Sequence, residues 1–239
     1  MWNALTKHVF YTNDNPETDR PSIGYVQGEK ACLLLDAGNS PAHVKLLKEG
    51  LAEQGLPDPN YLALTHAHWD HTYGLCGWDC ISFAGEKTNR ILSEMQKWQW
   101  DDASMRKRIE MGEDSEFCFI HICKEYPDRS LIRVEQAKIS FTGEMKIDLG
   151  GVTAVLKEIV SPHAEDCVVI FVPEDGLLFL GDSYCAVPVG EDWIYDKELL
   201  GEYINWLEGE DFKIAIKSHQ PPQTKAELLT DMKAAFNML

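Results

Sequence analysis

The stretch THAHWDH, residues 65–71, decides how this 239-residue sequence is interpreted. The apolar run YLAL immediately before it predicts a short buried strand. Side chains two positions apart at a strand end point to the same side, so His66 and His68 could grip one ion together. If a helix begins directly afterwards, Asp70 and His71 project from its first turn and could hold a second ion. Imidazole and carboxylate ligands in this mixture suit Zn²⁺, with Mn²⁺ or Fe²⁺ as alternatives.

Three further candidate ligands each follow a strand-like run farther along the chain. His163 follows Val160-Ser161-Pro162, Asp182 follows LFLG, and His219 follows IAIKS. Loops at the ends of successive strands can converge at one edge of a sheet and form a site there. A lone histidine is more often a surface or core residue. Three such strand ends after a cluster of metal-type ligands nevertheless predict one shared site.

Strand and helix signals alternate around these residues, which predicts layered α/β structure rather than a helix bundle. Strand-like runs lie at residues 9–12, 22–27, 31–36, 61–64, 144–149, 152–160, 167–172, 177–180 and 212–216. Ser40 is a predicted helix cap with Pro41 at the first helical position. The pattern of residues 86–111 predicts one long helix or two short ones. Further helices are expected over 197–207 and from residue 225 onward.

Taken together, these motifs resemble the metallo-β-lactamase superfamily. THAHWDH matches its HxHxDH signature, and LLLDAG, Pro162-His163, FLGDS and SHQPP are similar to its other motifs, in order over about residues 20–225. The resemblance implies an α/β fold, the four-layer αββα sandwich, as a single domain over residues 1–239 with a helical lid insertion at about 86–133. It implies that His66, His68 and His163 bind a first metal ion, that Asp70, His71 and His219 bind a second, and that Asp182 bridges them.

The chemistry implied by the resemblance is hydrolysis with two divalent metal ions, with Zn²⁺ as the first expectation. Bound metal lowers the pKa of water toward about 7 and polarises the substrate oxygen. Asp70 is the candidate catalytic residue, because it could orient the nucleophile and relay a proton. The expected substrate is a small ester, lactone, thioester or phosphodiester. The alternatives are a one-iron enzyme resembling the persulfide dioxygenases of the superfamily, and a metal-binding sensor without turnover.

Bulk properties restrict the partners. The chain carries 39 acidic residues against 22 Lys and Arg, a net charge of −17, which disfavours nucleic-acid binding. The N-terminal sequence lacks the basic and apolar pattern of a signal peptide, and no apolar run reaches the ~20 residues of a membrane span. Seven cysteines without a CxxC pair predict reduced thiols. We therefore expect a cytoplasmic protein that acts on a small molecule, without nucleic acid or membrane.

Residues 86–133 are rich in Trp, Met and Phe, with cations between them. An apolar stripe of this kind predicts packing inside the segment, a homodimer interface or a lid over substrate. Its cations could meet an anionic substrate; they are Arg106, Lys107, Arg108, Arg129 and Arg133. Trp69 is expected either to pack beneath the metal loop or to form an apolar wall for the substrate. Tyr184 stays unassigned, Cys185 is expected to be a small buried hydrophobe, and His121 is not expected to be a ligand.

Overall fold

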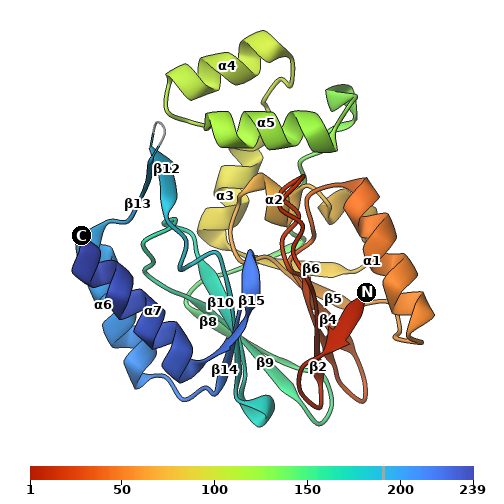
Figure 1. The fold of residues 1–239 in the computed structure, drawn as a ribbon. Coiled ribbons are helices and arrows are strands. Elements are labelled where there is room, and N and C mark those ends of the chain that lie inside the picture. Colours follow the sequence, from red (N-terminus) through yellow and green to blue (C-terminus); the bar gives the residue numbers. More distant parts are fainter. Residues whose placement is uncertain (190–191) are drawn as a thin grey trace.

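The computed structural model describes residues 1–189 and 192–239 and contains two β-sheets packed face to face (Figure 1). The strands of the first sheet lie side by side in chain order: β1 (Trp2–Ala4), β2 (Val9–Thr12), β3 (Gly24–Gln27), β4 (Cys32–Leu35), β5 (Tyr61–Ala63), β6 (Ile81–Gly85) and β7 (Ile139–Phe141). The pairs up to β4 are antiparallel, and the pairs from β4 to β7 are parallel. Parallel neighbours need crossover connections, and helical segments supply them here.

The second sheet has the order β15-β14-β11-β10-β9-β8. Its strands are β8 (Glu144–Asp148), β9 (Thr153–Glu158), β10 (Val168–Val172), β11 (Leu177–Gly181), β14 (Ile214–Lys217) and β15 (Gln220–Thr224). Only β11 and β14 pair in parallel within it, and helix α6 (Lys197–Gly209) lies between them in the chain. A separate hairpin of β12 (Val187–Val189) and β13 (Asp192–Ile194) precedes that helix.

Three apolar clusters define four layers. Between the sheets, Leu35 and Phe83 of the first sheet belong to one cluster with Ile170 and Phe179 of the second. A second cluster lies under α1 (Pro41–Glu53) and α3 (Glu86–Met95), on the outer face of the first sheet. The third joins the second sheet to α6 and α7 (Lys225–Met238). This order of helix, sheet, sheet and helix is visible in Figure 1 and confirms the predicted αββα sandwich.

Most predicted elements are present, with ends that coincide or differ by one or two residues. Ser40 caps α1, because its Oγ accepts a hydrogen bond from the His43 amide at 2.9 Å. Residues 86–111 form two helices, α3 and α4 (Asp102–Glu110), and Asp101 caps the second of them. The prediction missed β1, β6, β7, β15, the hairpin β12–β13 and the helix at Glu116–Glu125. Most of these are short, and β15 carries Pro221 and Pro222, which a sheet tolerates at its edge.

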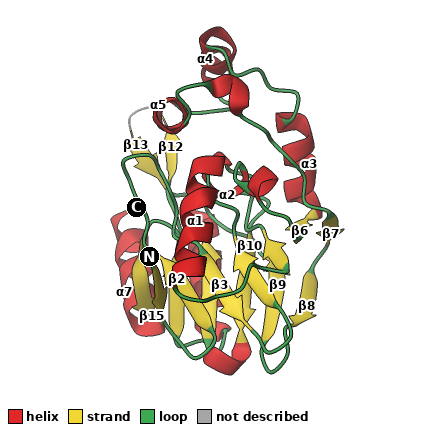
Figure 2. Ribbon diagram, turned by 90° about the vertical axis from the view of Figure 1, so that its right-hand side faces the viewer, coloured by secondary structure: helices red, strands yellow, loops and turns green. Residues whose placement is uncertain are grey.

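Helices α4 and α5 (Glu116–Glu125) stand apart from the four layers, over one end of the sandwich (Figure 2). A buried ion pair fastens the end of α5 to the sandwich. Glu125 accepts hydrogen bonds from Arg20 at 2.8 and 3.2 Å, and Ser40 also donates to it. Within the described residues, no helix is long and apolar enough to cross a membrane.

Candidate metal centre

Two groups of His and Asp side chains converge at the end of the sandwich that α4 and α5 overhang. The first group is His66, His68 and His163, and the second is Asp70, His71, Asp182 and His219. Within each group the potential ligand atoms lie within 4.8 Å of one another. The side chains come from the end of β5, from the short helix α2 (Trp69–Thr72), and from the loops after β9, β11 and β14. The structure therefore brings together every residue that the motifs predict as a ligand.

The first group consists of three imidazoles, and the surroundings keep two of them, His66 and His163, neutral. His68 Nδ1 lies 3.0 Å from His163 Nε2, and the ring centres of His66 and His68 are 4.5 Å apart. Burial, reinforced by the neighbouring His71, His68 and His163, lowers the pKa of His66 far below its ordinary value. Burial and then the adjacent His68 lower the pKa of His163 to about 4. Neutral imidazole is the form that binds a metal ion.

The second group pairs two histidines with two carboxylates. Asp70 Oδ2 lies 2.9 Å from His71 Nε2 and 3.2 Å from His219 Nε2. Asp182 Oδ2 lies 3.4 Å from each of the same two nitrogens and 3.9 Å from His163 Nε2 of the first group. Burial acts to raise the pKa of Asp182, but His219 and His71 outweigh it and hold the pKa well below its usual value. Asp182 is thus an ionised carboxylate between the two groups.

The spacing and chemistry of both groups fit metal ions. Tetrahedral zinc with ligands at about 2.0–2.1 Å places neighbouring ligand atoms about 3.4 Å apart, and the separations above are 2.9–3.4 Å within each group. His66 Nε2 and Asp182 Oδ1 are also buried without a hydrogen-bond partner among the described residues. Without a metal ion these atoms would stay unpaired at a cost in free energy, whereas coordination to a metal ion would satisfy them.

Asp36 and Thr65 orient the histidines from behind. Asp36 Oδ2 accepts a hydrogen bond from His71 Nδ1 at 2.7 Å, so Nε2 of that ring faces the site. Thr65 Oγ1 donates to Asp36 Oδ2 at 2.9 Å and lies 3.0 Å from His66 Nδ1. With its proton given to Asp36, the Thr65 hydroxyl accepts from His66 Nδ1, which leaves the lone pair of His66 on Nε2. Outer partners of this kind fix the tautomer and the direction of metal-binding imidazoles.

The two sheets meet at the site, and one glycine permits their close approach. The Val168 amide donates to Thr65 O at 2.7 Å, linking β10 to the loop after β5. Gly181 ends β11 with φ +54°, and a Cβ there would lie 2.7 Å from Thr65 Oγ1. Only glycine adopts this backbone easily and leaves that space free. Gly181 therefore sets the position of Asp182, the next residue.

Two buried carboxylates at the site were not predicted. Asp166 Oδ2 accepts a hydrogen bond from the Ala67 amide at 2.9 Å and so holds the HxHxDH loop. Asp19 Oδ1 lies 3.8 Å from His219 Nδ1, and burial, with the nearby Asp70, raises the pKa of Asp19 to about 7. Asp166 could have been inferred from its place three residues after His163. Asp19 lies in an irregular polar segment, and only the fold brings it to the site.

A cavity of about 830 Å³ lies in front of both groups, and it reaches beneath the helical segment of residues 86–133. His68, Asp70, His163, Asp182 and His219 line one side of it. The segment contributes mainly apolar side chains to the opposite side, among them Ile91, Met95, Trp98, Phe117 and Ile122. Tyr184, Cys185 and the hairpin β12–β13 form a further wall. Any molecule that reaches the metal centre from this cavity meets the segment.

The cations of the segment do not face this cavity, contrary to the expectation that they would meet an anionic substrate. None of Arg106, Lys107, Arg108, Arg129 and Arg133 is among the described lining residues. Arg108 is buried against the rings of Trp98 and Trp100. Arg129 pairs with Asp102. Arg108 and Arg129 therefore contact other residues of the segment, and their charges do not line the cavity.

Other residues singled out in the sequence have structural partners. Ser183 is fully buried and donates to Leu180 O at 2.7 Å, away from the metal groups. His121 Nδ1 contacts its own helix at Phe117 O, 2.8 Å away, and belongs to neither group. Tyr184 stacks on Tyr195 with ring centres 5.5 Å apart.

Comparisons with known proteins agree with this geometry. Residues 17–211 match the family model described as the metallo-beta-lactamase superfamily, and the chain belongs to this superfamily. No curated protein sequence matches the chain. Its two groups of histidines and aspartates are able to hold metal ions, as the fold leads one to expect.

Solved structures share the fold at low sequence identity. The DIM-1 metallo-beta-lactamase has a TM-score of 0.66 and 16% identity, covering 100% of this chain and 97% of its own. A metallo-beta-lactamase family protein from Thermus thermophilus has a TM-score of 0.65 and 21% identity, covering 97% and 81%. A double mutant of the sec-alkyl sulfatase PisA1 has a TM-score of 0.70 and 14% identity over 99% of this chain, which spans 41% of that protein.

Proposed function

We propose that the chain is a dinuclear metal-dependent hydrolase of a small ester, lactone, thioester or phosphodiester. The observation that carries the proposal is the place of Asp182, whose Oδ2 lies within 3.4–3.9 Å of histidines from both groups. A carboxylate in this place can bridge two ions and fix their separation. His66, His68 and His163 would hold the first ion, and Asp70, His71 and His219 the second.

Two bound divalent ions would supply a water with a pKa near ~7 and a Lewis acid for the substrate oxygen. The residues of the chain have separate tasks around that chemistry. Asp70 lines the cavity as an ionised carboxylate, and it would orient the attacking water and accept its proton at a carboxylate oxygen. Asp36 and Thr65 would keep His71 and His66 aimed at the ions. The apolar segment over the cavity would limit access of bulk water.

The nature of the ligands supports Zn²⁺ as the metal, since imidazole and carboxylate suit it, while Fe and Mn accept the same set. The alternative of a single iron acting on a sulfur substrate needs only one occupied group. The completeness of the second group, with Asp70, His71, Asp182 and His219 all within reach, supports two ions.

The proposal is tested by turnover of a chromogenic panel of lactones, thioesters, esters, β-lactams and phosphodiesters. We expect at least one class to be hydrolysed, with activity lost on chelation and restored by Zn²⁺. Oxygen consumption is measured in parallel with a persulfide as the substrate. Oxygen uptake without hydrolysis of any class would replace the hydrolase by the one-iron enzyme.

A further inference from the structure

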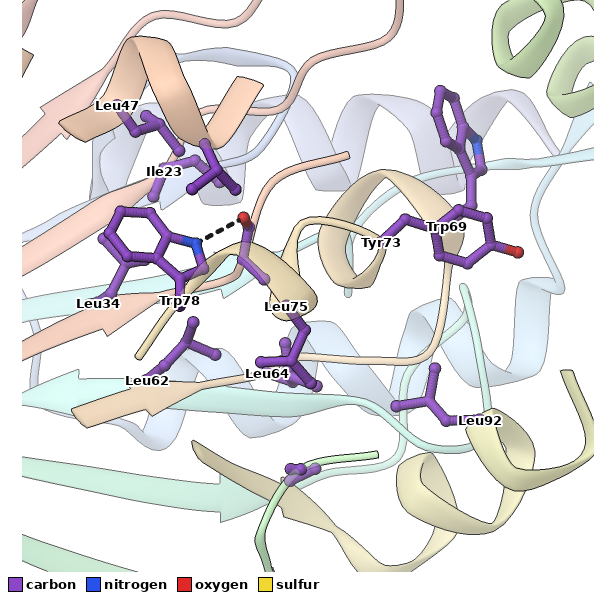
Figure 3. Packing of buried hydrophobic residues seen from close by; sticks show 14 of the residues in the cluster. Ile23, Leu34, Leu47, Leu62, Leu64, Trp69, Tyr73, Leu75, Trp78 and Leu92 are labelled. Carbon is purple, nitrogen blue, oxygen red and sulfur yellow. Dashed lines mark hydrogen bonds between the residues drawn. The ribbon is translucent and has the colours of Figure 1, made fainter. Parts of the chain in front are cut away.

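Two buried hydrogen-bond donors, one on helix α2 and one just after it, lack acceptors within the described part of the chain. Trp69 Nε1 and the Tyr73 hydroxyl have no hydrogen-bond partner among the described residues. The two side chains are only 4% and 1% exposed. They lie one helical turn apart, at the start and just after the end of α2, with their rings edge to face (Figure 3). Burying a polar group without a partner carries a free-energy cost, so an unpaired donor in a native protein calls for an explanation.

Comparable donors elsewhere in the chain are paired. Trp78 Nε1 donates to Ala37 O at 3.0 Å, the bond drawn in Figure 3, and Trp2 Nε1 donates to Leu47 O at 3.1 Å. Both belong to the same apolar cluster as Trp69. The buried tyrosines behave likewise, since Tyr25, Tyr126 and Tyr203 bond to Pro57 O, Asn39 O and Ser183 Oγ respectively. The fold pairs its buried aromatic donors as a rule, and Trp69 and Tyr73 depart from that rule together.

The position of the two donors suggests what they bind. Both side chains line the 830 Å³ cavity, beside the loop that carries His68 and Asp70. Around them the cavity wall is apolar, with Ile91, Met95, Trp98 and Ile122. Ligand sites commonly combine an apolar wall with a few polar groups that fix orientation. The two donor atoms have no accessible surface of their own, so a ligand with an acceptor atom would pair with them once the side chains turn those atoms toward the cavity.

The charge of the cavity restricts the ligand further. Its wall carries acidic side chains outside the proposed metal ligands: Asp14, Asp19, Glu113, Asp114, Glu165, Asp166 and Asp231. Lys217 is the only Lys or Arg among the described lining residues. It already donates to Gln220 and lies over the Tyr184 ring, 5.5 Å from its centre. An anionic group on the substrate would be repelled by these carboxylates, because the one described lysine of the wall is already engaged.

We propose that the substrate is a largely apolar molecule without a free anionic group, whose body carries a neutral hydrogen-bond acceptor, such as a ketone, ether or amide oxygen, that Trp69 and Tyr73 bind. Only the identity of the reacting bond rests on the proposed hydrolase function. The recognition itself depends on the two donors and the wall around them. Among the candidate substrate classes, this favours uncharged esters, lactones and thioesters over phosphodiesters.

The first test is thermal stability, which separates an unpaired hydroxyl from a paired one. Tyr25→Phe removes a donor bonded to Pro57 O and should lower Tm by about 2–4 °C, the shift for one buried hydrogen bond in a chain of this size. Tyr73→Phe removes a hydroxyl without a protein partner and should leave Tm unchanged or raise it. A loss in Tyr73→Phe equal to that in Tyr25→Phe would show that the hydroxyl is already satisfied, and would overturn the proposal.

The second test measures binding with two probes of matched size on the metal-loaded protein. Acetophenone carries a carbonyl acceptor, and ethylbenzene does not. Wild type and Tyr25→Phe should bind acetophenone about three- to tenfold more tightly, the range of a net hydrogen bond. In Tyr73→Phe combined with Trp69→Phe, the two affinities should become equal. Equal affinities in wild type, or a preference that survives the double substitution, would contradict the assignment.

The final arm compares p-nitrophenyl esters of hexanoate, its 3-, 4- and 5-oxo derivatives, and adipate with a free carboxylate. At least one oxo ester should have the highest kcat/KM and adipate the lowest, with the oxo preference lost in the double variant. Faster turnover of adipate than of hexanoate would contradict a substrate without a free anionic group. No turnover of any ester, together with an intact preference for acetophenone, would remove the ester-hydrolase function and leave the recognition site standing.

Discussion

The metal-binding end of the sandwich and the helical segment of residues 86–133 face each other across one cavity, but they are built differently. The proposed metal ligands follow buried strands whose backbones are hydrogen-bonded across the two sheets, as Val168 is to Thr65. Helices α4 and α5 lie outside the four layers (Figure 2), where Met105 and Ile122 join the apolar cluster on the outer face of the first sheet and the Glu125–Arg20 pair adds a polar contact. One side of the cavity is thus built from strand ends of both sheets, and the other from helices that pack on the outer apolar cluster alone.

This difference suggests a division of labour. The strand ends fix the chemistry, because small displacements there would change the distances among the ligands. The helical segment can vary in shape and side chains without altering the metal groups, since every proposed ligand lies outside it. Loss of a ligand should therefore affect all substrates, whereas a change in the segment should affect only those that contact it.

The largest effect is expected at Asp182. Asp182→Ala should reduce kcat/KM on every substrate by at least about 10³-fold, beyond the roughly 10–100-fold typical of outer partners of a metal. Asp182→Glu should retain more activity, because it keeps the negative charge at a displaced position. Asp148→Ala is the control, since its carboxylate is 72% exposed and remote from the site. Wild-type turnover by Asp182→Ala would exclude the bridging role.

The attachment of the helical segment is tested at Glu125. Glu125→Ala should lower the free energy of unfolding by about 3 kcal/mol, because it leaves Arg20 without its partner at a largely buried site. Metal content and turnover of a small activated ester should survive, since neither depends on α5. Chemical denaturation gives the first quantity. Glu94→Ala, which removes an exposed pair with Lys97, should cost no more than about 0.5 kcal/mol. Loss of metal from Glu125→Ala would mean that the segment helps to build the centre.

The close approach of the sheets is tested at Gly181. Gly181→Ala should cost about 2 kcal/mol and reduce metal content, because the left-handed backbone disfavours a Cβ and Thr65 occupies its space. Gly55→Ala is a matched control with φ +67° and nothing within 4 Å of the added atom. It should show only the backbone cost of about 1 kcal/mol, with metal content unchanged. Equal results for the two variants would contradict a specific role for Gly181.

The smallest and most selective effect is expected at Trp98. Trp98→Ala should reduce kcat/KM about tenfold on a substrate with a large apolar body and hardly change it on a small ester, because remote contacts orient the reacting centre. Trp100→Ala is the matched comparison, since Trp100 packs edge to face on Tyr73 and is not among the described residues that line the cavity. Its effect should be smaller. An equal loss on both substrates would assign the segment a purely structural role.

The sequence predicts the convergence of these His and Asp side chains because most of them follow a strong local signal. His66, His68, Asp182 and His219 come just after apolar strand-like runs, and such ends meet at one edge of a layered fold. The orientation of the arginines in residues 86–133 has no such signal. Whether Arg108 faces a cavity or packs between two indoles depends on how α4 packs against its neighbours, and local periodicity does not determine that.

The same reasoning explains why the sequence leaves the role of Trp69 open and does not reveal that Asp19 belongs to the site. The sequence allows two interpretations of Trp69, packing or substrate wall. Whether its Nε1 has a hydrogen-bond partner bears on this choice, and only the three-dimensional structure shows it. Asp19 lies in a polar segment that resembles any loop, and it reaches His219 across 200 residues of chain. Short strands such as β1 and β12 escape prediction because three residues give too few alternations to define a pattern.

The central claim is that two ions are held by the two groups, and counting metal ions in matched variants tests it most directly. Metal analysis of purified wild-type protein should give about two divalent ions per chain. His66→Ala should lose mainly the ion of the first group and His219→Ala mainly that of the second, so each variant should retain about one. A single ion in wild type that His219→Ala leaves in place would contradict the account.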